Sequence, residues 1–136
     1  MYPAHFDSLP GSDAVPLHVL LAEDEFLIRL DLAESIRALG WIVVEVSTAD
    51  EAIELIRAKV RFDLVVTDVK MPGHTDGRDL ARLVRQTDPA TKVVLVTSEP
   101  QRSAEDGDLY DLFLRKPVWN IGPHLIPLMR RARHAD

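Results

Sequence analysis

The 136-residue chain contains no cysteine. A disulfide framework and a thiolate metal site are therefore both excluded. The lack of cysteine also fits a reducing compartment better than a small secreted fold, so we expect a cytoplasmic protein. No apolar run approaches the roughly 20 residues that a membrane-spanning helix requires, and we expect no membrane segment.

Positive charge is in the minority, since 16 lysines and arginines stand against 22 aspartates and glutamates and leave a formal net charge of −6. An acidic domain repels a phosphate backbone, so we expect no direct contact with nucleic acid. The basic cluster Arg130, Arg131 and Arg133 is too short to reverse this. It suits the end of a helix, where positive charge complements the macrodipole.

What is present is the composition of one globular domain, with 46% hydrophobic and 28% charged residues. Residues 1–16 contain several prolines and lack the basic-then-apolar pattern of a signal peptide. We expect them to form a flexible N-terminal arm. Residues 17–136 are then expected to form the single folded domain.

Short apolar runs alternate with helical patterns along this domain. The runs cover residues 17–22, 41–46, 62–67, 92–97 and 110–114. Such alternation predicts an α/β fold in which helices cover both faces of a doubly wound, mostly parallel sheet of five strands. The pattern of helices is interrupted at two places. A short polar stretch with Pro100 predicts that the fourth helix is reduced or replaced by a loop. Pro127 is expected to kink or shorten a final helix over residues 120–132.

Polar side chains follow four of the expected strands. Glu23 and Asp24 follow the first, Asp68 the third, Thr97 ends the fourth, and Lys116 follows the fifth. Ligands of a doubly wound sheet bind outside the carboxyl ends of its strands. Singly, such residues are usually loop caps or solvated turns; their joint occurrence predicts a shared site.

A cluster of three carboxylates requires positive charge. Two like charges 4 Å apart repel by about 4 kcal/mol at an effective dielectric near 20, and Lys116 supplies only one positive charge. A divalent cation would supply the rest, and an open site of oxygen ligands suits Mg²⁺. The same groups suit phosphoryl transfer to Asp68, with Lys116 and Thr97 facing the phosphoryl oxygens.

These strand ends resemble the receiver domain of two-component response regulators. The resembling segments are residues 20–25 (LLAEDE), 64–73 (LVVTDVKMPG), 94–98 (VLVTS) and 113–117 (FLRKP). The likeness covers roughly residues 17–133 and implies a flavodoxin-like sheet with strand order 2-1-3-4-5. The short stretch between Thr97 and Lys116 further resembles small stand-alone alphaproteobacterial receivers.

The resemblance implies a role for each matching residue. Asp68 would be the phospho-acceptor, and Thr97 and Lys116 would contact the phosphoryl group. Phe113 matches the aromatic residue whose rotamer reports the active state. The phosphodonor would be a sensor histidine kinase, so the chain would be a self-phosphorylating acceptor with slow autodephosphorylation and not an enzyme in the ordinary sense.

The resemblance also implies a Mg²⁺ site. Its ligands would be the side chains of Asp24 and Asp68 and the backbone carbonyl of Lys70, while Glu23 would hold the ion through water. Glu99 lies two positions after Thr97, and a Lys70–Glu99 ion pair over Asp68 would shield an acyl phosphate from water. Two solvated loop side chains are an equally good interpretation.

The leading hypothesis is a stand-alone receiver that signals by protein–protein contact or passes its phosphoryl group to a histidine phosphotransferase. One alternative is a receiver-like adaptor that works without phosphorylation. A phosphatase with an aspartate nucleophile is a weaker alternative, because such enzymes need a second aspartate where this chain has Lys70. Trp119 is either an exposed interface anchor or packed over the last helix.

Overall fold

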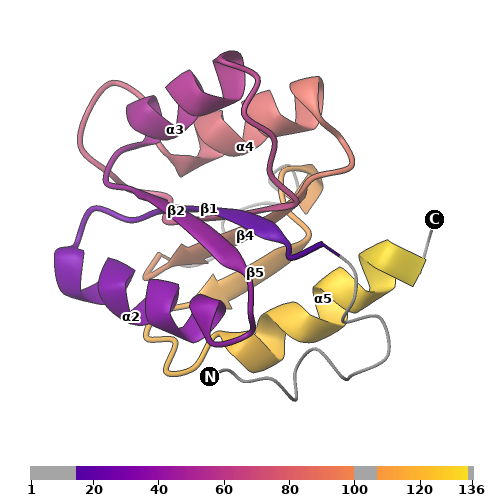
Figure 1. Ribbon diagram of the computed structural model, residues 1–136. Helices are drawn as coiled ribbons and strands as arrows, with labels where there is room; N and C mark the ends of the chain where they lie inside the picture. Colours follow the sequence, from indigo (N-terminus) through magenta and orange to yellow (C-terminus); the bar gives the residue numbers. More distant parts are fainter. Residues whose placement is uncertain (1–14, 100–106, 135–136) are drawn as a thin grey trace.

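The computed structural model describes residues 15–99 and 107–134 of the chain. Five strands form one sheet in the order β2-β1-β3-β4-β5, and every neighbouring pair is parallel (Figure 1). The strands are β1 (His18–Ala22), β2 (Ile42–Val46), β3 (Leu64–Thr67), β4 (Lys92–Thr97) and β5 (Leu112–Arg115). The predicted doubly wound sheet and its strand order are therefore confirmed. The expected arm falls almost wholly outside the described residues.

Helices cover both faces of the sheet. The helices α2 (Phe26–Arg37) and α5 (Gly122–His134) lie on one face, and α3 (Ala49–Arg57) and α4 (Gly77–Thr87) lie on the other (Figure 1). Each face has its own apolar cluster, with Ile36 and Leu125 fully buried in the first and Leu80 in the second. Because the strands are covered on both faces, their side chains are apolar almost throughout.

Side-chain caps fix where two of the helices begin. Thr48 is the N-cap of α3, and its hydroxyl accepts a hydrogen bond from the Glu51 amide at 3.0 Å. Asp76 caps α4 by accepting from the Asp79 amide at 3.1 Å, and the Asp79 carboxylate accepts in return from the Asp76 amide at 2.9 Å. These caps satisfy amides that have no partner within the helix.

The connection from β4 to β5 is described only in part. Its described parts, residues 98–99 and 107–111, contain no α-helix, and the rest of the predicted reduced helix lies outside the described residues. Arg85 of α4 holds residues 107–111 in place, because it donates hydrogen bonds to the Asp111 carboxylate at 2.8 Å and to the Asp108 carbonyl at 3.1 Å. Asp111 also accepts from the Val93 amide at 2.8 Å, which ties this segment to β4.

The last helix does not end at Pro127. It begins at Gly122 and continues past Pro127 to His134, so the predicted shortening is wrong, while the predicted kink stays a prediction. The buried side chains of Leu125, Leu128 and Met129 hold the helix against the sheet on either side of the proline. Tertiary packing thus outweighs the single backbone hydrogen bond that proline removes.

None of the helices within residues 15–99 and 107–134 combines the length and the apolar character that a membrane crossing would require.

Candidate functional site

The site is built where β1 and β3 end side by side. Ala22 and Thr67 are register partners, and the Asp68 amide donates to the Ala22 carbonyl at 3.0 Å. The Glu23 amide donates to the Val46 carbonyl of β2 at 3.1 Å. The two residues that follow the strands, Glu23 and Asp68, therefore leave the sheet next to each other.

Three carboxylates meet at this edge. Glu23, Asp24 and Asp68 each offer one oxygen, and these oxygens all lie within 4.8 Å of one another. Glu23 is 1% and Asp68 8% exposed, whereas Asp24 faces solvent. The sequence-based expectation that these residues converge is met by the geometry.

Lys116, which directly follows the edge strand β5, places its positive charge in this cluster. Its Nζ lies 2.7 Å from Asp68 Oδ2 and 2.7 Å from Glu23 Oε1. The Lys116 amide donates to the Thr97 carbonyl at 2.9 Å, and the peptide bond to Pro117 is cis. One ammonium thus serves two buried carboxylates.

Burial and charge oppose each other in this cluster. Burial raises the pKa of Glu23 above its ordinary value, and the bonds from Lys116 and from the Glu25 amide offset only part of that rise. Burial by itself lowers the pKa of Lys116, but the bonds to Asp68 and Glu23 outweigh it and leave that pKa raised. Lys116 therefore stays charged at neutral pH.

The donor set fits a hard divalent cation. Glu23 Oε1 is buried, and its ion-pair partner, the Lys116 ammonium, is shared with Asp68. The three carboxylates carry more negative charge than Lys116 can balance, and oxygen ligands of this kind favour Mg²⁺. The residues present are thus compatible with the expected metal ion.

The backbone around Asp68 is held tightly. Asp68 Oδ1 accepts from the Val69 amide at 2.6 Å, and the Thr67 hydroxyl donates to the Asp68 carbonyl at 2.8 Å. Gly77 packs directly above this carbonyl, because a Cβ added there would lie 1.9 Å from the Asp68 oxygen. Only glycine permits so close an approach.

Thr97 ends β4, and Phe113 lies within the neighbouring strand β5. Thr97 is buried at the end of β4, and its Oγ1 accepts from the Glu99 amide at 3.2 Å. Phe113 is half-buried in β5 opposite Leu95, with its ring centroid 5.7 Å from that of Tyr110. Contact of Thr97 with a phosphoryl group and a switching role for Phe113 stay predictions.

Lys70 and Glu99 form an ion pair, which was one of the two equally weighted alternatives. Lys70 Nζ lies 2.8 Å from Glu99 Oε2, although the Lys70 side chain is 76% exposed. An ion pair so exposed contributes under about 1 kcal/mol to folding. Shielding of an acyl phosphate by this pair, and metal ligation by the Lys70 carbonyl, stay predictions.

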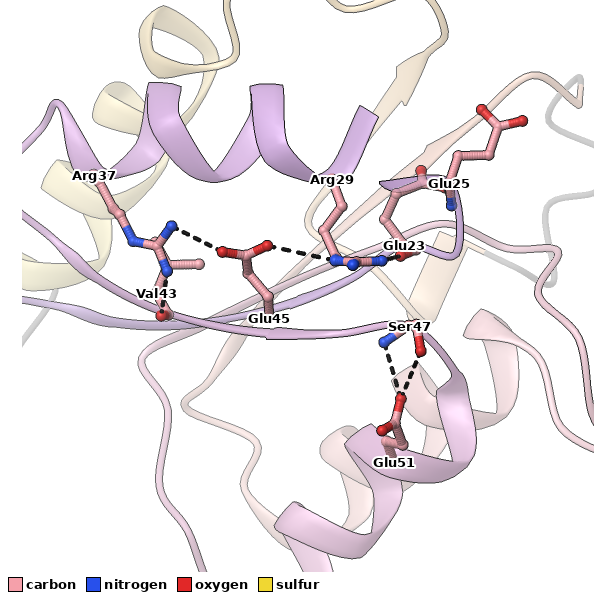
Figure 2. A network of polar contacts seen from close by, with 8 residues as sticks. All are labelled: Glu23, Glu25, Arg29, Arg37, Val43, Glu45, Ser47 and Glu51. Atoms are coloured by element: carbon pink, nitrogen blue, oxygen red, sulfur yellow. Dashed lines mark hydrogen bonds and ion pairs between the residues drawn. The ribbon is translucent and has the colours of Figure 1, made fainter. Parts of the chain in front are cut away.

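Sequence reasoning missed Arg29. Its Nη1 donates to the Glu23 carbonyl at 2.8 Å, so a residue on α2 holds the turn that carries two of the carboxylates (Figure 2). No motif marks Arg29 in the sequence, since an arginine on an amphipathic helix is ordinarily solvated.

A parallel sheet in the order 2-1-3-4-5, with three carboxylates and a lysine at its carboxyl edge, defines the receiver class of α/β proteins. Residues 19–117 match the response regulator receiver domain family, and the chain belongs to that family. The family assignment made from the sequence is confirmed; the finer likeness to alphaproteobacterial receivers stays a prediction. Receiver domains in general are phospho-acceptors of two-component systems that bind Mg²⁺ in an acidic pocket.

Two curated relatives illustrate the similarity. The transcriptional regulatory protein PdtaR of Mycobacterium tuberculosis is 49% identical over 83 residues, which are 60% of this chain and 40% of PdtaR. The response regulator receiver protein CpdR of Brucella abortus is 33% identical over 79 residues, 58% of this chain and 64% of CpdR. The match thus spans less than two thirds of either relative.

Solved structures agree with the fold. A response regulator receiver protein of Sinorhizobium medicae has a TM-score of 0.74 and 28% identity, covering 88% of this chain and 96% of that one. The response regulator TrrA of Thermotoga maritima, solved in complex with Mg²⁺-BeF, has a TM-score of 0.74 and 25% identity, covering 85% of this chain and 98% of its own.

Proposed function

We propose that this chain is a cytoplasmic receiver that accepts a phosphoryl group on Asp68 from a sensor histidine kinase. The observation that carries the proposal is the position of Lys116 Nζ, 2.7 Å from both Asp68 and Glu23 inside a cluster of three carboxylates. An isolated ion pair would need one carboxylate. A phosphoryl-transfer site needs a nucleophile and positive charge on either side of it.

The transfer uses groups that are already in place. A carboxylate oxygen of Asp68 attacks the phosphorus of the donor phosphohistidine, and the new P–O bond forms as the P–N bond breaks. The electron pair of the broken bond stays on the imidazole nitrogen. Lys116 then balances charge on the phosphoryl oxygens, and the Thr97 hydroxyl donates a hydrogen bond to one of them.

Glu23, Asp24 and Asp68, with the Lys70 carbonyl, are the groups that would hold Mg²⁺. When bound, the ion supplies positive charge that neutralises the phosphoryl oxygens. The excess negative charge of the cluster and the sharing of one ammonium between Glu23 and Asp68 support this assignment. TrrA, which was solved with Mg²⁺-BeF, lends further support.

Output would pass through protein–protein contact or through onward transfer to a histidine phosphotransferase. Trp119, two residues beyond the Lys116–Pro117 peptide, is 83% exposed, so the exposed alternative is the correct one. Leu27 and Phe26, in the first turn of α2 close after Asp24, are 75% and 61% exposed. Large apolar side chains exposed beside an acceptor are suited to docking a protein partner.

The proposal is tested by the intact mass of the protein after incubation with acetyl phosphate and Mg²⁺. We expect a phosphoryl adduct on the native chain, and none on Asp68→Asn or when Mg²⁺ is chelated. Incubation with a phosphorylated histidine kinase follows if acetyl phosphate is not accepted. A native chain that stays unmodified by both donors would favour the phosphorylation-independent adaptor.

The phosphatase alternative gains no support from the site. The position two residues after Asp68 holds Lys70, whose side chain pairs with Glu99, and not the carboxylic acid that would protonate a leaving group in such enzymes. Turnover of a generic phosphate ester, absent in Asp68→Asn, would restore this alternative.

A further inference from the structure

The turn that follows β1 carries Glu23 and Asp24, and its conformation decides where their carboxylates point. Within the turn, the Glu25 amide donates to Glu23 Oε2 at 3.0 Å. Glu25 is the N-cap of α2, but its side chain makes no capping hydrogen bond. The turn therefore lacks the side-chain cap that fixes the starts of α3 and α4, and it depends on contacts from elsewhere.

Arg29 supplies such a contact. Its Nη1 donates to the Glu23 carbonyl at 2.8 Å, and this is the one hydrogen bond that the carbonyl accepts within the described chain. The Glu23 amide is meanwhile bound to the Val46 carbonyl. Both backbone groups of Glu23 are thus held, one from β2 and one from α2.

The guanidinium of Arg29 is itself held in place. Its Nε lies 3.4 Å from Glu45 Oε1, its Cζ lies 5.5 Å from the Phe26 ring centroid, and its side chain is 17% exposed. Figure 2 shows the guanidinium group of Arg29 lying between Glu45 on β2 and the Glu23 carbonyl. A planar group with separate donors can hold two acceptors at a fixed separation.

Glu45 has a second arginine partner that provides a matched comparison. Arg37 Nη1 donates to Glu45 Oε2 at 2.8 Å and Arg37 Nη2 to the Val43 carbonyl at 3.1 Å (Figure 2). Arg37 contacts no residue of the turn within the part of the chain that the structure describes. Arg29 and Arg37 therefore share one carboxylate, but only Arg29 touches the carboxylate-bearing turn.

We propose that Arg29 is a positioning residue of the Mg²⁺ site. By binding the Glu23 carbonyl it fixes the peptide between Glu23 and Asp24, and hence the direction in which both side chains leave the backbone. Groups that orient metal ligands in this way commonly affect affinity by one or two orders of magnitude. The inference rests on the proposed function, because it assumes that the carboxylates bind Mg²⁺.

Positioning and electrostatics make opposite predictions for loss of Arg29. Removing a positive charge near an acidic cluster should strengthen cation binding, by Coulomb's law alone. Releasing the Glu23 carbonyl should weaken it, because the carboxylates then spend less time in the convergent arrangement. A weakened affinity in a neutral variant therefore identifies the positioning effect.

The test is a Mg²⁺ titration of the full chain, followed through the amide chemical shifts of ¹⁵N-labelled protein. We expect Arg29→Gln to bind Mg²⁺ about tenfold more weakly than the native chain. We expect Arg37→Gln, which loses the same carboxylate partner, to keep the native affinity. Arg29→Lys retains the charge but not the fork, and we expect it to bind more weakly than the native chain, which covers the case in which the glutamine variant does not fold.

The outcomes are distinguishable. A native chain without Mg²⁺-dependent shifts would overturn the proposed metal site and this inference with it. Native binding with unchanged or stronger affinity in both Arg29 variants would overturn the inference alone. Equal weakening in Arg29→Gln and Arg37→Gln would also overturn it, because the effect would then arise from general loss of packing between α2 and β2.

Discussion

At the scale of single residues, a glycine packs against a backbone carbonyl of the site, with no room for a side chain between them. Gly77 begins α4, and its amide donates to the Val69 carbonyl at 2.7 Å. Its Cα approaches the Asp68 carbonyl so closely that no side chain fits between them. The start of this helix and the position of Asp68 are consequently coupled.

We therefore expect Gly77→Ala to destabilise the fold by about 3 kcal/mol, since a methyl group would push the Asp68 backbone or the helix out of place. Urea denaturation measures the change. Gly107→Ala is the matched control, because a Cβ there meets no atom within 4 Å, and we expect a change within about 0.5 kcal/mol. Similar losses in both variants would show that the approach to Asp68 is not the cause.

At the scale of elements, the cap of α3 makes its stability depend on pH. Glu51 Oε1 accepts from the Ser47 amide at 3.0 Å and the Ser47 hydroxyl at 2.9 Å (Figure 2). The Ser47 backbone bond is the main cause that lowers the pKa of Glu51 below its ordinary value of 4.5, with the Ser47 hydroxyl adding to it. A carboxylate that keeps its charge in the folded state stabilises the fold wherever it is ionised.

The sign follows from the lowered pKa. The stabilisation by Glu51 is complete above pH 4.5, and it is lost as the pH falls through the lower folded-state value. We expect Glu51→Gln to lose up to about 1 kcal/mol at pH 7 and nothing at pH 2, with the effect kept small by solvent around this exposed group. Denaturation of both proteins from pH 2 to 7 measures this, and a difference that does not vary with pH would contradict it.

The strands and helices could be predicted because apolar runs alternate with helical patterns along the chain. Buried strands and amphipathic helices space their apolar residues differently, and this spacing is visible in the sequence. The convergence of Glu23, Asp24, Asp68 and Lys116 was predictable too, because strand ends of a parallel sheet share one edge. Arg29 was not predictable, since its bond depends on the rotation of α2 about its axis. The continuation of α5 past Pro127 could not be predicted, because it depends on tertiary packing that the local sequence does not show.

At the scale of the whole molecule, binding of Mg²⁺ at the proposed site would stabilise the fold. An ion that binds only the folded state stabilises it according to its concentration relative to its dissociation constant. We expect Mg²⁺ at ten times that constant to raise the free energy of unfolding by about 1.4 kcal/mol, measured by urea denaturation with and without the ion. Asp24→Asn, which removes an exposed carboxylate of the cluster, should lose most of this gain. A full gain in that variant would place the ion elsewhere.

The reach of Lys116 has a consequence for the growing chain on the ribosome. It bonds to Asp68, 48 residues earlier, and pairs with Glu23 at the end of the first strand, so the two acidic partners are synthesised long before their cation. Until β5 has been made and added to the edge of the sheet, the carboxylates stand without that ammonium. The site therefore forms only after β5 has joined the edge of the sheet.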